Sequence, residues 1–311
     1  MNRFIFSLFV FISLSSSYSQ DLIDKTQLKE HMEYLASDEL MGRDTGSEGI
    51  EKAAQFIETH FSKIGVKPFY ETYRDSFMVK NMHAYNIIGL VEGTDSELKN
   101  EYLMVGAHYD HIGVSKKKVA GDSIVNGAND NASGTIAVMQ LANHFAAHPP
   151  KRSMLFVLFS AEERGLLGSK HLAKRINEEK VQLTSVFNIE MIGVPLGDQH
   201  QYKAYFTGFD KSNYAKVFNE SESQRILGLY DEAEKMGLFR ASDNWPFYDL
   251  MKIPAHTVCT FDFTNYDYYH HPKDEAVFMD ITHMHQLIQS FAKGLEKVAN
   301  TKEEVRIVNN E

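Results

Sequence analysis

Short apolar runs alternate with helical patterns along most of the chain. Six runs indicate strands: "YNIIGLVEG", "YLMVGAH", "MLFVLFS", "TSVFNIEMIG", "QYKAYFTG" and "AHTVCTF". Helical spacing of apolar residues covers about 132–147, about 165–176 and about 281–298. Two earlier helical stretches are "QLKEHMEYLASDELMGR" and "GIEKAAQFIETHFSKIG", the second with Gly65 at the position expected of a C-cap.

This alternation predicts an α/β fold. Short strands interleaved with amphipathic helices favour a three-layer sandwich, in which helices cover both faces of a central, mostly parallel mixed sheet. The chain of 311 residues has no repeat, no low-complexity linker and no break long enough to start a second domain. We therefore expect one catalytic domain over residues 20–311.

The first residues have the pattern of an export signal. Arg3 supplies a positive charge, Phe4 to Leu14 are largely apolar, and Ser17 and Ser19 make a plausible cleavage site. About a dozen apolar residues are fewer than the roughly 20 that span a bilayer. We expect a signal peptide at residues 1–19, no membrane insertion after its cleavage, and a periplasmic or secreted mature protein.

Composition narrows the classes of function. The formal net charge of −10 argues against non-specific binding to nucleic acid or to anionic membranes, both of which need basic surfaces. With 43% hydrophobic residues the chain can build a sizeable core. Cys259 is the one cysteine, so no disulfide can form within the chain. An exported protein of this kind relies on its core and on bound metal. Nothing in the sequence indicates an oligomeric state.

Metal-binding residue types follow one predicted strand after another. In chain order they are His108 and Asp110, Glu162 and Glu163, Glu190, and His270 and His271, with Asp130 in the glycine-bounded turn "NGANDNASG". The carboxyl ends of strands in an open α/β sheet meet at one edge, so these side chains are expected to converge there. Taken singly, a helix cap explains Asp130 and a helix dipole explains the paired glutamates. Taken together, they predict a metal site.

The residue types favour zinc. Histidine and carboxylate ligands without thiolates suit this ion, and two ions with about three protein ligands each would require one carboxylate to bridge. Asp130, in its tight turn, is the best candidate for the bridge. Glu162 and Glu163 should point in opposite directions, so that one binds metal and the other acts as a base. Asp110 is placed to accept the imidazole N–H of His108 that faces away from metal.

The ordered motifs resemble a known family. "GAHYDH", "NGANDNASG", "FVLFSAEERGLLGS", "NIEMIG" and "YYHHPKDE" occur in the order and spacing of the co-catalytic di-zinc exopeptidases. This is the family of secreted bacterial leucine-type aminopeptidases, whose relatives include glutamate carboxypeptidase and the zinc glutaminyl cyclases. "LASDELMGRDTGSEG" near the start extends the resemblance over essentially the whole mature chain.

The resemblance implies residue roles and an activity. It implies two Zn²⁺ per chain, one held by His108, Asp130 and Glu190 and the other by Asp130, Glu163 and His270, with Glu162 as general base, Tyr269 as oxyanion helper and a cis peptide bond after Asp130. The implied reaction is hydrolysis of the first peptide bond of peptide substrates by a metal-bridging hydroxide. The chain would then be a zinc metallo-aminopeptidase.

Three positions depart from the family pattern or leave a choice open. Glu190 stands where relatives usually have aspartate, and Asn244 stands where they often have histidine. His271 competes with His270 for the last ligand position. The isolated histidines elsewhere in the chain are expected to have structural roles: His83, His144, His148, His256, His283 and His285.

Other activities fit parts of the same sequence. A glutaminyl cyclase would need one zinc on Asp130, Glu163 and His270, which would leave His108 and Glu190 without a role. An inert peptidase-like binding domain would be expected to have lost metal ligands. A carboxypeptidase would need a cation for the substrate's terminal carboxylate, for which Arg240 is available. The sequence does not indicate which substrate side chains are preferred.

Overall fold

The computed structural model describes residues 22–302 and 305–308, so the expected signal peptide lies outside the described residues. The helices are α1 Lys25–Leu35, α2 Glu48–Lys63, α3 Ser133–Ala147, α4 Leu167–Glu178, α5 Tyr214–Asn219, α6 Asp231–Lys235, α7 Asn244–Met251 and α8 Ile281–Asn300. The strands are β1 Lys67–Pro68, β2 Arg74–Val79, β3 Met82–Val91, β4 Tyr102–His108, β5 Val114–Val119, β6 Asp122–Ile124, β7 Ser153–Phe159, β8 Leu183–Glu190, β9 Ala204–Phe206, β10 Leu227–Gly228 and β11 Ala255–Cys259.

The central sheet is mixed, and its middle is parallel. Its strand order among the described residues is β1-β3-β7-β4-β8-β11-β9-β10, with β2 also paired to β3. Strands β7, β4, β8 and β11 run parallel to one another. On either side of them, β3 is antiparallel to β7, and β9 is antiparallel to β11. The mixed sheet expected from the sequence is confirmed, and the parallel pairing is concentrated at its centre.

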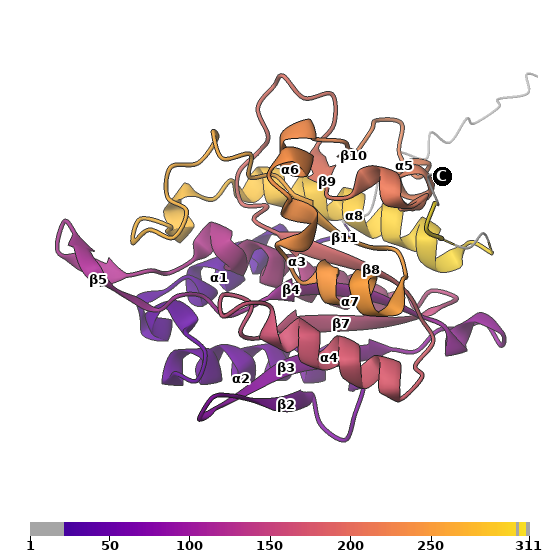
Figure 1. Cartoon of the computed structure of the whole chain (residues 1–311), viewed down its shortest axis with the longest axis horizontal. Coiled ribbons are helices and arrows are strands. Elements are labelled where there is room, and N and C mark those ends of the chain that lie inside the picture. Colours follow the sequence, from indigo (N-terminus) through magenta and orange to yellow (C-terminus); the bar gives the residue numbers. More distant parts are fainter. Residues whose placement is uncertain (1–21, 303–304, 309–311) are drawn as a thin grey trace, which may run out of the picture.

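Helices cover both faces of the sheet (Figure 1). Helix α3 packs on β4, β7 and β8, and contacts α1, α2 and α8 in the same layer. Helices α4 and α7 contact each other and cover the opposite face, on β3, β8 and β11. Almost every residue of α3 is buried, as is every residue of β7, because these elements lie inside the sandwich. The predicted three-layer α/β fold is confirmed.

Most strongly patterned segments form the expected elements. Helix α2 ends at Lys63 and is followed by Gly65 with a φ of 78°, the left-handed conformation expected after a helix. The segment from residue 227 to 251, for which the pattern predicted no element, forms β10, α6 and α7. Within the described residues, no helix has the length and apolar character needed to cross a bilayer.

The carboxyl ends of the central parallel strands bring polar residues to one edge. Strand β4 ends at His108 and β8 ends at Glu190. Strand β7 ends three residues before Glu162, and the turn before α3 contains Asp130. The side chains singled out in the sequence therefore meet where the fold predicts a site.

Candidate metal centre

Two groups of side chains meet at this edge, and both include Asp130. The smaller group consists of His108, Asp130 and Glu190. The Nε2 atom of His108 lies 3.3 Å from Oδ1 of Asp130 and 3.1 Å from Oε1 of Glu190. We call this the three-residue group.

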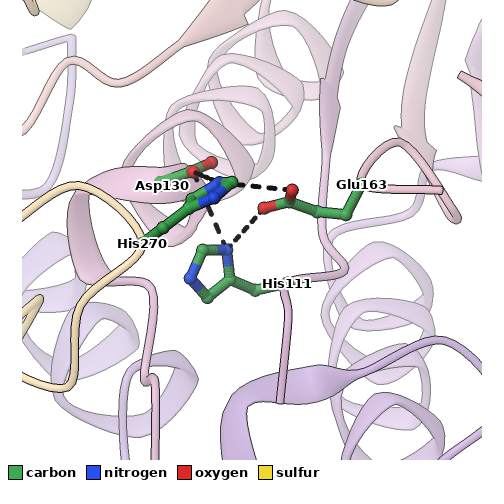
Figure 2. A group of neighbouring side chains, drawn as sticks. All are labelled: His111, Asp130, Glu163 and His270. Carbon is green, nitrogen blue, oxygen red and sulfur yellow. Dashed lines mark hydrogen bonds and ion pairs between the residues drawn. The ribbon is translucent and has the colours of Figure 1, made fainter. Parts of the chain in front are cut away.

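The larger group consists of Asp130, Glu163, His270 and His111, whose side chains point toward one another (Figure 2). The Nε2 atom of His270 lies 3.1 Å from Oδ2 of Asp130 and 3.3 Å from Oε2 of Glu163. The Nδ1 atom of His111 lies 2.8 Å from Oε1 of Glu163 and 3.8 Å from Oδ2 of Asp130. We call this the four-residue group.

Both groups have the donor atoms and the spacing that zinc needs. Bonds from zinc to nitrogen or oxygen are about 2.1 Å long, so a tetrahedral ion separates its ligand atoms by roughly 3.4 Å. The distances given above, from 2.8 to 3.8 Å, bracket that value. Asp130 presents Oδ1 to one group and Oδ2 to the other, which is the arrangement of a bridging carboxylate.

The turn that carries Asp130 is fixed from two sides. The carboxylate of Asp274 accepts hydrogen bonds from the backbone N–H groups of Asn129 (2.8 Å) and Asp130 (3.1 Å). The side chain of Asn131 accepts from the N–H of Met191 (3.1 Å) and donates to the carbonyl of Ile189 (2.9 Å). The peptide bond between Asp130 and Asn131 is cis, as the resemblance implied.

The contact between Asp110 and the His108 ring differs from the one predicted from the sequence. The Nδ1 atom of His108 lies 3.1 Å from the backbone carbonyl oxygen of Asp110, whereas the carboxylate Oδ1 is 3.9 Å away. The carboxylate instead accepts the backbone N–H of Glu162 at 3.1 Å and the hydroxyl of Thr45 at 3.3 Å. The predicted hydrogen bond from the His108 ring to the Asp110 carboxylate is therefore wrong, because the backbone carbonyl of the same residue is the nearer acceptor and the carboxylate is bound by Glu162 and Thr45.

Glu162 lies beside the three-residue group but belongs to neither group within the described residues. Burial raises the pKa of its carboxyl well above the usual value; the charge of His108 opposes this rise, and the carboxylates of Glu190 and Asp243 add to it. A glutamate with a raised pKa that is free of ligand contacts is suited to accept a proton. Glu163, its neighbour in the chain, faces the four-residue group instead.

Tyr269 and His270 form the outer wall of the site. Their rings stack with centroids 4.0 Å apart, and the Tyr269 side chain is 45% exposed. Burial of the rest of the ring and the nearby carboxylates, first Asp130 and then Glu163, raise the pKa of the Tyr269 hydroxyl, so it stays protonated. His271 accepts the backbone N–H of Lys273 at 3.0 Å through its Nδ1 and is in neither group.

The two departures from the family pattern have local explanations. Glu190 offers Oε1 to His108, while its Oε2 accepts a hydrogen bond from the Ser242 hydroxyl. The longer side chain is thus anchored by a serine. Asn244 is buried and is in neither group; its amide donates to the carbonyls of Phe239 (3.0 Å) and Ala255 (3.2 Å) and accepts the hydroxyl of Thr257 (2.7 Å).

A buried arginine joins the loops around the site. The guanidinium of Arg43 donates to the backbone carbonyls of Leu35, Tyr109, Asn126 and Gly127. Burial lowers the pKa of Arg43 to about 10, and nearby acids, Asp274 first, oppose this, so the group is charged at neutral pH. Its role is to position the segments that precede the candidate ligands.

Sequence reasoning did not assign a role to four residues of this site. They are His111, Arg43, Ser242 and Asp274. Three of them stand in motifs quoted above: Arg43 in "LASDELMGRDTGSEG", His111 in "GAHYDH" and Asp274 in "YYHHPKDE". Membership of a motif did not indicate what these side chains contact. The isolated histidines that were expected to be structural are in neither group, in the part of the chain that the structure describes.

A small pocket adjoins the three-residue group. It has a volume of about 100 Å³, and its walls include Glu190 and Tyr269 together with the apolar side chains of Met191, Leu238 and Phe261. Ligand pockets for whole small molecules are usually about 300–1,000 Å³. This pocket is therefore of a size to hold a single side chain next to the metal-binding residues.

The chain has an α/β fold, and its histidine and carboxylate groups meet at the carboxyl edge of the sheet. This is the edge at which α/β enzymes bind their substrates, so the fold and the site together are typical of a metal-dependent α/β protein. Residues 86–294, more than half of the chain, match the sequence profile of peptidase family M28. The chain belongs to that family.

Individual relatives agree with this assignment. The chain is 30% identical over 172 residues to aminopeptidase YwaD of Bacillus subtilis, a match that covers 54% of this chain and 34% of that protein. The matches span between 21% and 34% of the length of the first curated relatives.

Solved structures share the fold. BSAP, a zinc aminopeptidase from Bacillus subtilis, superposes with a TM-score of 0.68 at 16% identity, covering 91% of this chain and 98% of that one. Porphyromonas gingivalis glutaminyl cyclase gives a TM-score of 0.67 at 14% identity, covering 88% of this chain and 98% of that one. At these identities the likeness concerns the fold alone.

Proposed function

We propose that the chain is a zinc-dependent aminopeptidase that binds two Zn²⁺ and removes the first residue of peptides. The observation that carries the proposal is Asp130, which presents one carboxylate oxygen to each of two ligand groups. The names of its relatives, an aminopeptidase and a zinc aminopeptidase, support the same activity. Bound zinc would supply Lewis acidity, lowering the pKa of a water molecule and polarising the substrate carbonyl.

The chain's own residues divide the remaining work. Glu162 accepts the proton of the attacking water and returns it to the departing amine, for which its buried position beside His108 and outside both groups suits it. The Tyr269 hydroxyl, kept protonated among the carboxylates, donates a hydrogen bond to the developing oxyanion. The excess of carboxylates around the site favours a substrate with a cationic free amine.

The pocket beside Glu190 indicates the first side chain of the substrate. Its walls include apolar groups from Met191, Leu238 and Phe261, and its volume of about 100 Å³ holds one side chain. Apolar walls favour an apolar side chain because burial removes its surface from water. We expect leucine- or methionine-led peptides to be better substrates than those led by glutamate or lysine.

The second candidate function is glutaminyl cyclase, since a cyclase shares the fold. A single zinc on Asp130, Glu163 and His270 would serve that reaction, but it would not use His108 and Glu190. In the structure these two residues face each other at 3.1 Å and share Asp130 with the other group. Their convergence supports the two-metal hydrolase over the cyclase.

The N-terminal pattern adds a proposal about location. We propose that residues 1–19 direct export and are removed, leaving residues 20–311 as one catalytic domain in the periplasm or medium. Expression of the full chain in a bacterial host, followed by fractionation and N-terminal sequencing, tests this. A full-length protein retained in the cytoplasm would contradict it.

The decisive experiment follows two peptides by mass spectrometry with the zinc-loaded mature protein, one led by leucine and one by glutamine. Loss of the whole first residue, from the leucine peptide above all, is the expected result. Loss of ammonia alone, and only from the glutamine peptide, would establish the cyclase. No change in either peptide would contradict both activities.

A further inference from the structure

We propose that His111 is a fourth protein ligand in the four-residue group, so that the two metal positions are unequal. One ion would be held by His111, Asp130, Glu163 and His270, and the other by His108, Asp130 and Glu190 alone. The family resemblance assigned three residues to each ion. This inference rests on the proposed function only in taking the chain to bind divalent metal, and it holds whatever the substrate is.

The position of the His111 ring is that of a ligand. Its Nδ1 lies 2.8 Å from Oε1 of Glu163, the oxygen that His270 does not approach, and 3.8 Å from Oδ2 of Asp130. The His111 and His270 rings meet edge to face, with centroids 5.5 Å apart (Figure 2). Two imidazole nitrogens and two carboxylates around one point form a donor set that zinc binds readily.

The surroundings of His111 leave its ring no other polar role. The residue is fully buried, and its Nε2 has no hydrogen-bond partner among the described residues. The ring lies against Gly127, where a Cβ atom would come within 2.6 Å of it. The backbone N–H of His111 donates to the carbonyl of Arg43 at 3.2 Å. The ring is thus fixed with only Nδ1 directed at acidic groups.

Unequal ligand numbers imply unequal tasks. Zinc sites with four protein ligands are closed and structural, whereas catalytic sites keep a position open for water or substrate. The four-residue group would therefore retain its ion tightly. The three-residue group would keep the open position, and it is the one that adjoins Glu162 and the small pocket beside Glu190.

Metal retention tests the proposal without reference to activity. The zinc-loaded protein, the His111→Ala variant and the His271→Ala variant are dialysed against a graded series of chelator concentrations, and bound zinc is counted by mass spectrometry. The wild type should lose its ions in two separate steps. In His111→Ala the more tightly held ion should be lost at a chelator concentration at least about ten-fold lower than in the wild type, so that the two steps merge. His271→Ala, altered next to a proposed ligand but outside both groups, should keep two steps.

A cysteine at position 111 gives a direct readout. In His111→Cys loaded with cobalt, a thiolate bound to Co²⁺ would produce intense near-ultraviolet absorption that the wild type lacks, although the wild type contains the buried Cys259. Unchanged zinc retention in His111→Ala together with no new absorption in His111→Cys would overturn the proposal. Failure of every form, wild type included, to bind metal would instead contradict the proposed function.

Discussion

Glu162 and Glu163 are neighbours in sequence with different surroundings. Glu163 faces His111 and His270, whereas Glu162 is held by a hydrogen bond from its backbone N–H to Asp110 and lies beside the other group. The sequence predicted that the pair would divide in this way, on the expectation that successive residues at a strand end point in opposite directions. The pair instead stands in the turn after β7, which ends at Phe159, and Ala161 just before it has a φ of 58°. Only the resemblance indicated which glutamate is which.

The substitution Glu162→Gln should leave metal binding intact and lower kcat by about 100-fold or more, because it removes the proton acceptor and keeps the side chain's size. Turnover of a leucine-led peptide and zinc content measured on the same preparation check this. A variant that retains zinc and near-wild-type turnover would show that another group is the base.

Ser242 should affect metal binding through its contact with Glu190. Its hydroxyl occupies the Glu190 oxygen that does not face His108, so Ser242→Ala frees that carboxylate to rotate. We expect metal affinity at the three-residue group to fall by about 10- to 100-fold, with the more tightly held ion unaffected. Chelator titration of both ions measures this. Ser221→Ala, a serine whose hydroxyl donates to the Phe218 carbonyl, is the control.

At the level of secondary-structure elements, the strands supply part of the site and the loops between them supply the remaining residues. The central strands β3, β4, β7, β8 and β11 follow directly from the apolar runs, and so do two residues at strand ends, His108 and Glu190. His111 and Asp274 could not be placed in this way, because each stands in a loop whose path depends on contacts distant in sequence. Arg43 binds carbonyls up to 84 residues away, and no local pattern encodes such contacts.

Arg43→Met should destabilise the fold and loosen the site. The change leaves the buried carbonyls of Leu35, Tyr109 and Asn126 without this donor, whereas the Gly127 carbonyl keeps the backbone N–H of Ala132. Unmet buried acceptors cost about 1–3 kcal/mol each. We expect unfolding in urea to show a loss of at least about 3 kcal/mol. Arg164→Met removes a partly exposed ion pair with Asp44 and should cost less than about 1 kcal/mol. Equal losses in the two variants would refute this role for Arg43.

Buried neutral histidines limit the acid stability of the whole molecule. His256 is fully buried between the carbonyl of Thr207 and the hydroxyl of Ser212. Burial lowers its pKa to about 4, and the hydrogen bond to Thr207 opposes this. The unfolded ring takes up a proton near the usual pKa of about 6.5. Stability from the neutral ring is therefore complete above that pH and is lost as the pH falls toward 4.

Because of this single ring, the free energy of unfolding should be about 2 kcal/mol lower at pH 5 than at pH 7.5. Urea unfolding of the metal-free protein at both pH values measures the loss, and His256→Gln should show a pH dependence smaller by that amount. The wild type and the variant differ only in the titration of residue 256, so the contributions of the other titrating groups to the pH dependence cancel in the comparison. An identical pH dependence in both proteins would contradict the assignment.

The reach of Arg43 has a consequence for the smallest unit that can fold with its site intact. The match to the family profile begins at Asn86, and every candidate ligand lies between that residue and residue 294. A fragment trimmed to those boundaries would keep all the ligands and lose the guanidinium that closes their loops. Sequence similarity therefore outlines the chemistry of this protein but underestimates the length of chain that holds it in place.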